Sequence, residues 1–419
     1  MPSVKFFTLG CKVNQYDTQE MRERFLEAGF QEAHHKVAAD VYVINTCTVT
    51  HRADKDSLYY IHRSLRENPR AKIIATGCLA ELDKATIKAQ PGVSLIIPNK
   101  DKSRILQLLT RKNFPAKSGI SFFQGHTRAF VKVQDGCNNF CSYCKVPLVR
   151  GRSRSRKMAE VAAEVRNLVA RGYKEIVLTG ICLGAYGRDL KPRRSLADLI
   201  KVLEKTRGLL RIRLSSIEAG DVSDELISLM ARSKKLCPHL HIPIQSGDDA
   251  ILAKMNRSYT GNEYLALIRK IKRKIPKVAI TADVLVGFPG ETEAQFKNTI
   301  DLVKNIQPLR THIFPFSPRA GTAADCLADR ISPEVIRKRI TRLKKVAHEA
   351  GLGYQKQFLN HRVTVLFEQE KKSESGIWEG HTRQYIKVLM KSEKDLQNKI
   401  VRVALTKIDG ESLRAKINI

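Results

Sequence analysis

Three short apolar runs in the first eighty residues each lead into a cysteine, and a fourth run follows. The runs are 4–9, 41–45, 72–76 and 93–97. Segments of helical character separate them, and strands that alternate with helices form parallel sheets. The ligand crevice of such an open sheet lies at the carboxyl ends of its strands. The sequence therefore predicts an N-terminal parallel α/β domain with three thiols at one sheet edge: Cys11, Cys47 and Cys78.

Capping signals place the first helix of this domain. Asp17 offers an acceptor for a helix start, and Glu20 follows three residues later. We expect the helix to begin there and to stop near Gly29.

The middle of the chain repeats the alternation of strands and helices. Its strand-like runs are 130–133, 176–178, 210–214, 240–244, 279–286 and 313–316. Amphipathic helical segments lie between most of them, for example 158–170, which Gly172 terminates. Six such units fit a complete or partial TIM-type barrel, a central (β/α)6 barrel whose working face is the carboxyl end of its strands.

The last sixty residues change character. Short strand-like runs at 363–367, 385–389, 400–405 and 413–417 are separated by polar, glycine-containing stretches. This pattern predicts a small all-β barrel. The overall class is therefore α/β with an appended β-barrel, and the predicted domains are 1–118, 123–354 and 355–419.

The charge balance narrows the class of partner. Lys and Arg exceed Asp and Glu by 32, and the excess is spread over the chain but heaviest in its middle. Such a field points to a polyanion, nucleic acid before membrane. A generally basic, solvated surface is the alternative. The candidate phosphate contacts are Arg150, Arg152, Arg154 and Arg156.

The cellular compartment is predicted from two features that the sequence does not contain. No apolar run reaches the roughly 18–20 residues that span a membrane, and residues 1–5 have no secretory character. We expect a cytoplasmic protein with no membrane partner, in which thiols stay reduced. Nine cysteines then indicate metal binding or catalysis rather than disulfides.

A second cysteine set, Cys137, Cys141 and Cys144, follows the first strand of the central domain. Three thiolates in one loop suit Zn²⁺ or an iron–sulfur cluster. A structural zinc site would need a fourth ligand, commonly in a second short-spaced pair, and no such pair is nearby. Three ligands on a four-iron cluster leave one iron open to a small molecule. We therefore expect two [4Fe–4S] clusters. No role is assigned to Cys182, Cys237 and Cys326.

These residues carry a family resemblance. The 137–144 loop resembles the signature of radical S-adenosylmethionine enzymes, and the C-terminal barrel resembles the RNA-binding TRAM domain. Segments 8–17, 45–47 and 76–78 resemble the N-terminal domain of methylthiotransferases. Further matching segments are 150–152, 238–247, 255–257 and 287–292. Segment 10–17 is most similar to the tRNA branch that acts on N6-threonylcarbamoyladenosine at position 37.

The resemblance implies a reaction that replaces C2–H of an adenine by a methylthio group, which requires radical chemistry because that hydrogen is not acidic. The cluster on Cys137, Cys141 and Cys144 would bind S-adenosylmethionine and yield a 5′-deoxyadenosyl radical. The cluster on the N-terminal cysteines would carry the inserted sulfur. Alternatives are the same chemistry on isopentenyladenosine-37 tRNA or a ribosomal protein, and, in another class, a zinc-stabilised, non-enzymatic RNA-binding protein.

The resemblance also implies cofactor and RNA contacts. Family analogy puts S-adenosylmethionine contacts at strand ends, where each residue could equally serve backbone geometry: Thr179, Gly180, Ser215, Ser216, Gln245, Val286 and Gly287. RNA contacts on the C-terminal barrel are predicted at Trp378, Arg383, Tyr385 and Lys387. Here the alternative is that the two aromatic side chains fill a small core. Expected partners are the tRNA anticodon loop, an electron donor such as flavodoxin or ferredoxin, and a sulfur donor. We expect a monomer.

Overall fold

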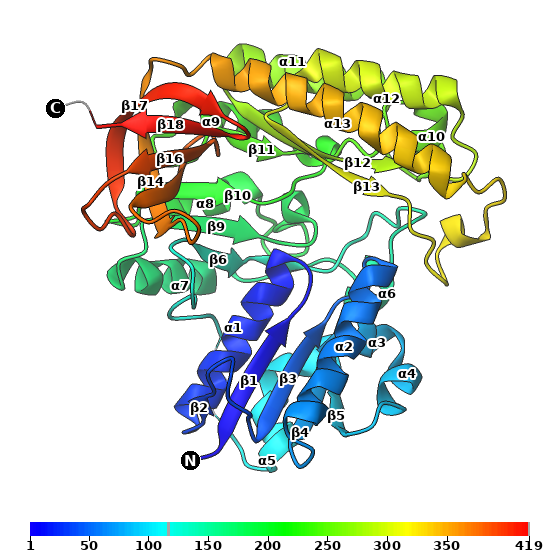
Figure 1. The fold of residues 1–419 in the computed structure, drawn as a ribbon, viewed down its shortest axis with the longest axis vertical. Coiled ribbons are helices and arrows are strands. Elements are labelled where there is room, and N and C mark those ends of the chain that lie inside the picture. The colour runs from blue at the N-terminus through cyan, green and yellow to red at the C-terminus, as the bar shows by residue number, and fades with distance from the viewer. Residues whose placement is uncertain (115–117, 418–419) are drawn as a thin grey trace.

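The computed structural model describes residues 1–114 and 118–417, in three regions that follow one another along the chain (Figure 1). The N-terminal region is a parallel sheet of order β2-β1-β3-β4-β5. Its strands are β1 (Ser3–Thr8), β2 (Gln31–Glu32), β3 (Val41–Thr46), β4 (Lys72–Gly77) and β5 (Val93–Ile97). Its helices are α1 (Lys12–Glu27), α2 (His51–Glu67), α3 (Cys78–Leu82), α4 (Lys84–Lys88), η1 (Asn99–Arg104) and α5 (Ile105–Thr110).

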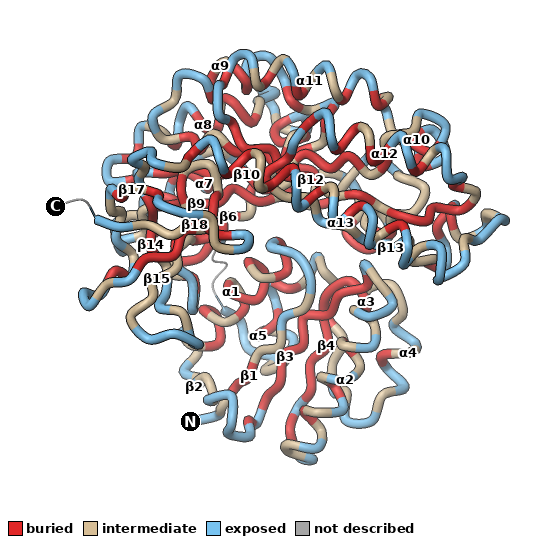
Figure 2. Tube along the Cα trace, turned by 45° about the horizontal axis from the view of Figure 1, so that its top comes forward, coloured by how far each residue is buried: buried red, intermediate tan, exposed pale blue. Residues whose placement is uncertain are grey.

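The central strand of this sheet shows why the sequence folds this way. Every residue of β3 is buried, because helices cover both faces of the sheet. Tyr42 and Ile44 pack into one apolar cluster, whereas Val41 and Val43 pack into another, as the two-residue alternation of a strand requires. Figure 2 shows the resulting buried track along β3 and β4.

The first helix starts earlier than predicted. α1 begins at Lys12, with Cys11 as its N-cap residue, and ends before Gly29 as expected. Asp17 is therefore not a cap. It lies inside the helix, buried against cations from other segments, which no local capping signal reveals.

The middle region is a partial barrel. Its strands are β6 (Ala129–Lys132), β9 (Glu175–Thr179), β10 (Arg211–Leu214), β11 (His239–His241), β12 (Ala279–Val286) and β13 (Arg310–Pro315). They form two parallel sheets, β6-β9-β10 and β11-β12-β13, joined by isolated parallel bridges such as Ser216 to His241. The predicted α/β fold with a six-strand partial barrel is confirmed. A short antiparallel pair, β7 (Gln134–Asp135) and β8 (Arg154–Ser155), flanks the second cysteine loop.

Helices cover the outside of this barrel. The helices of the middle region are α6 (Val146–Arg150), α7 (Met158–Ala170), η2 (Leu183–Ala185), α8 (Leu196–Glu204), η3 (Ala219–Asp221), α9 (Asp224–Arg232), α10 (Asp249–Lys254), α11 (Gly261–Lys274), α12 (Glu293–Ile306), η4 (Ala323–Cys326) and α13 (Pro333–Lys356). Of these, α6 contacts α3 and η1 of the N-terminal region. α7 spans the predicted 158–170. Among the described residues, no helix is long and apolar enough to cross a membrane.

The C-terminal region is a closed barrel of order β14-β15-β16-β18-β17. Its strands are β14 (Arg362–Glu370), β15 (Ile377–Thr382), β16 (Lys387–Lys391), β17 (Ile400–Asp409) and β18 (Ser412–Lys416). β15 was not predicted, because only its first two residues are large and apolar. The strand predicted from 385 begins at Lys387, because Tyr385 has a left-handed backbone, with φ of 69°.

Candidate active site

The N-terminal cysteines meet at the edge of the sheet that faces the barrel. They follow the neighbouring strands β1, β3 and β4, whose arrowheads in Figure 1 point toward that region. A Cβ placed on Gly10 would lie 2.7 Å from Sγ of Cys47, so Cys47 packs against the loop that carries Cys11. Burial raises the pKa of Cys47 to about 11 and also raises the pKa of Cys78. The predicted juxtaposition of the three thiols is what the fold produces.

Glycine permits the turn that presents a cysteine in both regions. Gly77 precedes Cys78 with φ of 93°, and a Cβ there would lie 2.3 Å from the carbonyl oxygen of Thr46. Gly136 precedes Cys137 with φ of 73°, and a Cβ there would lie 2.1 Å from the carbonyl oxygen of Arg152. Neither position can take a side chain without moving the backbone that places the thiol.

The second cysteine set occupies the loop between β7 and α6, and a distant segment holds that loop. The backbone N–H of Ser142 donates to the carbonyl of Met255 at 3.0 Å, and Asn256 Nδ2 donates to the carbonyl of Phe140 at 3.0 Å. Arg257 Nη1 donates to Sγ of Cys141 at 3.2 Å. The 255–257 segment, which carried part of the family resemblance, thus fixes the cysteine loop.

The thiols of this set differ in electrostatic environment. Burial raises the pKa of Cys144 to about 12, whereas a hydrogen bond from Cys182, opposed by burial, lowers the pKa of Cys137 to about 7. Cys182 was assigned no role from the sequence, but it is buried beside the loop, where Asn139 Nδ2 reaches its sulfur at 3.8 Å. Only the fold brings it there, since 45 residues of chain separate it from Cys137.

The spacing of the thiols distinguishes a cluster from a single ion. Within the described residues, the one group of three His, Cys, Asp or Glu donor atoms that all lie within 4.8 Å of one another is His241, Asp283 and His312. Neither cysteine set is that compact. A zinc ion bound at about 2.3 Å to three thiolates would hold the sulfurs about 3.8 Å apart. The wider spacing fits a cluster, in which each thiolate binds a different iron.

Both cysteine sets face one inter-domain space. A cavity of about 450 Å³ is lined by thiols of both sets, by Gln245 and by Arg319. The cysteines concerned are Cys11, Cys78 and Cys144. A second cavity, of about 530 Å³, shares Cys11, Asp283 and Phe314 with the first and extends into the barrel. A molecule bound here would be in reach of both cysteine sets.

The barrel interior is polar along half of its wall. Successive inward positions lie two residues apart, as strand geometry requires. They are Arg213 and Ser215 at β10, His239 and His241 on β11, Thr281 and Asp283 on β12, and Arg310, His312 and Phe314 on β13. An interior of this kind receives a ligand, whereas packed barrels present bulky aliphatic residues there.

Three of the seven predicted S-adenosylmethionine contacts line these cavities: Ser215, Ser216 and Gln245. Thr179 and Val286 are buried in the barrel wall. Gly180 packs against Gln134, and Gly287 packs against Ile336.

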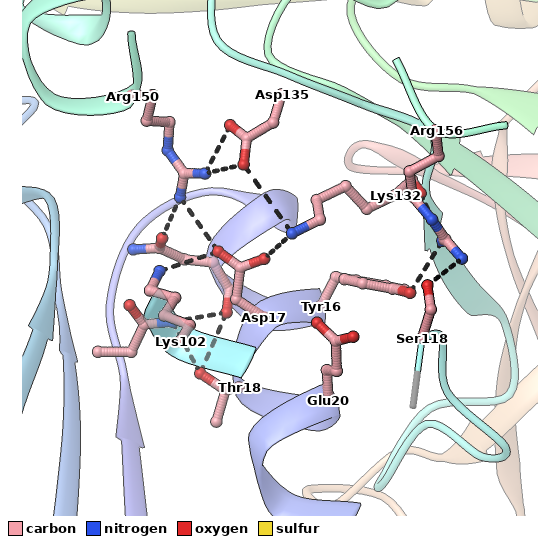
Figure 3. A network of polar contacts seen from close by, with 12 residues as sticks. Tyr16, Asp17, Thr18, Glu20, Lys102, Ser118, Lys132, Asp135, Arg150 and Arg156 are labelled. Atoms are coloured by element: carbon pink, nitrogen blue, oxygen red, sulfur yellow. Dashed lines mark hydrogen bonds and ion pairs between the residues drawn. The ribbon is translucent and has the colours of Figure 1, made fainter. Parts of the chain in front are cut away.

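Two of the four predicted arginine contacts to RNA phosphates are wrong. Arg150 is buried, and it pairs with Asp135 at 2.8 Å and with Asp17 at 3.5 Å (Figure 3). Arg156 donates to the phenol of Tyr16 at 3.0 Å and pairs with Glu164. These side chains join the N-terminal region to the barrel. The remaining two, Arg152 and Arg154, are exposed.

The predicted RNA contacts on the C-terminal barrel have other partners. Arg383 donates to the carbonyl of Leu236 at 2.8 Å, and Tyr385 lies 4.7 Å below the guanidinium of Arg213 at the cavity wall. Lys387 pairs with Glu379 at 2.7 Å, and Trp378 packs partly buried against the barrel core. Arg383 and Tyr385 therefore face the middle region, not an outer RNA surface.

The sequence did not lead us to predict the row of inward-facing polar residues in the barrel. His239, His241, Asp283, Arg310 and His312 were given no role. The available signal was polar residues at every second position in otherwise apolar strands, as in His239-Leu240-His241.

Comparisons with known proteins agree with this architecture. Residues 131–303 match the radical SAM superfamily, and residues 3–98 match a family described as the uncharacterized protein family UPF0004. A structure of the radical S-adenosylmethionine methyltransferase TsrM from Kitasatospora setae shares the fold, with a TM-score of 0.57 and 14% identity over 77% of each chain. Fold and sequence together define a radical S-adenosylmethionine protein.

Two curated relatives align over nearly the whole chain. The threonylcarbamoyladenosine tRNA methylthiotransferase MtaB of Bacillus subtilis is 40% identical, over 97% of this chain and 94% of that protein. The tRNA-2-methylthio-N(6)-dimethylallyladenosine synthase of Clostridium tetani is 34% identical, over 98% and 95%. This chain belongs to the tRNA methylthiotransferase family and is a transferase. The predicted cofactors, [4Fe–4S] clusters and S-adenosylmethionine, are those of this family.

Proposed function

We propose that this protein converts N6-threonylcarbamoyladenosine at position 37 of tRNA to its 2-methylthio derivative. One observation carries the proposal: cysteines of both sets, namely Cys11, Cys78 and Cys144, line adjoining cavities at the carboxyl ends of the barrel strands. The relative that bears this activity in its name is more similar than the dimethylallyladenosine synthase is, at 40% against 34% identity. Domain limits near 118, 123 and 355 complete the proposal.

The cysteine sets would hold two [4Fe–4S] clusters, Cys137, Cys141 and Cys144 on the barrel side and Cys11, Cys47 and Cys78 on the other. When bound, these groups supply radical generation from S-adenosylmethionine and a carrier for sulfur. The chain contributes the enclosure. Buried thiols with raised pKa values need a cationic centre to hold them as thiolates, which fits metal binding at both sets.

Chain residues then position the reactants. Gln245, Ser215 and Ser216 offer polar contacts at the cavity wall for S-adenosylmethionine. Arg257 supports the cysteine loop from behind, through Cys141 and an ion pair with Glu218. The apolar side chains Leu285, Phe314 and Phe316 line the space between the cysteine sets and limit access of water to it.

The tRNA would approach from the exposed side of the cysteine loop. Arg152 lies there with its guanidinium 5.2 Å from the ring of Phe140, and both side chains are exposed. Together with Arg154 they provide phosphate contacts and a stacking surface beside the cavity. A cytoplasmic monomer supplied by a reducing protein and a sulfur donor is part of the proposal.

The deciding experiment is mass spectrometry of tRNA nucleosides from a deletion strain. Loss of 2-methylthio-N6-threonylcarbamoyladenosine, with other methylthio nucleosides unchanged, is the expected result. The wild-type gene should restore the nucleoside, whereas Cys47→Ala and Cys141→Ala should not. Loss of a methylthiolated isopentenyladenosine instead would refute the substrate assignment. Colourless protein with stoichiometric zinc after anaerobic purification would refute the enzyme.

A further inference from the structure

The larger cavity carries a strong positive charge on its wall. Four cations line it, whereas Asp283 is the one carboxylate that lines it among the described residues. Lys12 comes from the N-terminal region, and the other three come from the partial barrel: Arg128, Arg213 and Arg310. The cavity volume of about 530 Å³ is within the range of nucleoside-sized pockets.

Two of these cations are already committed to carboxylates. Arg128 pairs with Glu368 at 2.9 Å, and Arg213 pairs with Glu175 at 2.7 Å. Both guanidiniums also lie over the ring of Tyr385, at 5.2 and 4.7 Å. They therefore build the wall and hold the C-terminal barrel against it.

The other two cations are free to bind a ligand. Lys12 is exposed and has no ion pair among the described residues. Within residues 1–114 and 118–417, Arg310 has one ion-pair partner, Glu411, at 3.9 Å, and that carboxylate is 74% exposed. Both cationic side chains line the same cavity as His239 and His312. After burial, both charges contribute to lowering the pKa of each imidazole, and at His312 they are opposed by Asp283. The two cations thus converge on one part of the cavity.

Unpartnered polar groups lie in the same wall. Ser215 Oγ and His239 Nδ1 are buried and have no hydrogen-bond partner in the part of the chain that the structure describes. A buried polar atom left unpaired costs about 1–3 kcal/mol, so these atoms mark where a ligand would donate or accept. The wall therefore offers two cations together with neutral hydrogen-bonding groups.

We propose that Lys12 and Arg310 bind the carboxylate of the threonylcarbamoyl group and so select this substrate over prenylated adenosine. The inference rests on the proposed function and adds its specificity determinant. A threonylcarbamoyl group carries one carboxylate beside urea and hydroxyl groups, which match two cations beside Ser215 and His239. A dimethylallyl group has no polar atom, and burying it here would leave these groups desolvated and unpaired.

The test compares four anticodon stem-loop RNAs that carry N6-threonylcarbamoyladenosine, its methyl ester, N6-dimethylallyladenosine or unmodified adenosine at position 37. Equilibrium binding to the anaerobic holoenzyme is measured by fluorescence anisotropy, and thiolation is measured in parallel. We expect wild-type protein to bind the RNA that carries the carboxylate at least about tenfold more tightly than the RNA that carries the methyl ester. In Lys12→Met/Arg310→Met the two affinities should become equal, while Arg310→Lys should keep most of the preference.

Control variants separate binding of the substrate carboxylate from a general effect of surface charge or of cluster loss. Lys345→Met removes an exposed cation from the outer helix α13 and should leave the preference unchanged. Iron content of the Lys12→Met protein must match wild type, because that residue adjoins Cys11. Equal binding of acid and ester by wild-type protein, an equal loss for both RNAs in the variants, or a change in S-adenosylmethionine affinity alone would each overturn the inference. Thiolation of a prenylated stem-loop but not of the carboxylate RNA would instead overturn the proposed function.

Discussion

Replacing Asp17 by asparagine should destabilise the contact between the N-terminal region and the barrel. Asp17 is buried within α1, and its carboxylate faces three cations: Lys102 at 2.9 Å, Arg150 at 3.5 Å and Lys132 (Figure 3). Burial alone would raise the pKa of Asp17, but the three positive charges hold it far below its usual range. The amide keeps the shape of the side chain and removes only the charge.

The magnitude follows from these contacts. At an effective dielectric constant near 20, a contact of about 3 Å is worth about 5–6 kcal/mol. Three such contacts oppose the desolvation of four buried ions, which costs several kcal/mol per ion. Removing the central charge removes the ion pair of Lys102 and leaves Arg150 and Lys132 to share Asp135, so we expect the variant to lose about 3–5 kcal/mol of stability. Because α1 begins next to Cys11, iron bound to the N-terminal set should fall as well.

Hydrogen exchange of peptides from α1 is the appropriate assay. The chain has one tryptophan, Trp378, and its fluorescence reports on the C-terminal barrel instead. Asp56→Asn is the matched control, since Asp56 is half-exposed and lies 3.9 Å from Arg52. A loss below about 1 kcal/mol for Asp17→Asn would refute the reasoning, because breaking a buried ion pair costs more than that.

The contribution of Asp17 to the stability of the protein depends on pH in a definite direction. An aspartate with a lowered folded pKa stabilises the protein fully above its unfolded pKa of about 3.9, and the stabilisation is lost as the pH falls through the folded value. The difference between wild type and Asp17→Asn should therefore be constant above about pH 5 and shrink only in strong acid.

Three further outcomes are expected. Cys47→Ala should lower iron from about eight to about four per chain and abolish thiolation, while S-adenosylmethionine cleavage persists. Gly77→Ala should cost about 3 kcal/mol, because its Cβ would meet the carbonyl of Thr46 at 2.3 Å, and calorimetry with iron analysis measures this. Arg152→Ala and Arg154→Ala should each lower the salt slope of tRNA binding by about one, in affinity titrations at several salt concentrations.

Controls for these outcomes come from the same chain. Gly29→Ala meets nothing within 4 Å at φ of 84°, so it should cost only the backbone strain of about 1 kcal/mol. If Cys47→Ala retains the full iron content, the N-terminal set does not hold a cluster. Unchanged salt slopes in both arginine variants would remove those side chains from the RNA interface.

Local patterns were enough to predict most of the fold. Strand periodicity located the four main strands of the first sheet and all six strands of the partial barrel, since each is an apolar run bounded by turn residues. β15 was missed because most of its residues are polar or small, and it pairs on both sides within a closed barrel, so hydrogen bonding rather than apolar content defines it. The start of α1 was missed because Cys11 provides no side-chain cap.

The cysteine sets were predictable from the sequence for a different reason. Parallel strands end at the same sheet edge, so residues that follow them become neighbours whatever their separation in the chain. No such rule predicts the ion network of Asp17, whose partners lie 85, 115 and 133 residues away. Contacts of this kind depend on how two domains dock, and the pattern of side chains within either domain does not predict that docking.

The buried cations also bear on what the net charge means. Arg150, Arg156 and Arg213 contribute to the count of Lys and Arg, yet each is held by a carboxylate inside the protein. Paired burial removes one charge of each sign, so it leaves the excess of 32 almost untouched for the remaining residues. The excess must therefore be displayed on the surface and in the open cavity, as with Arg152, Arg154 and Lys12. The inference of a polyanionic partner survives the loss of two of its four named arginines, because it depended on the imbalance rather than on any single side chain.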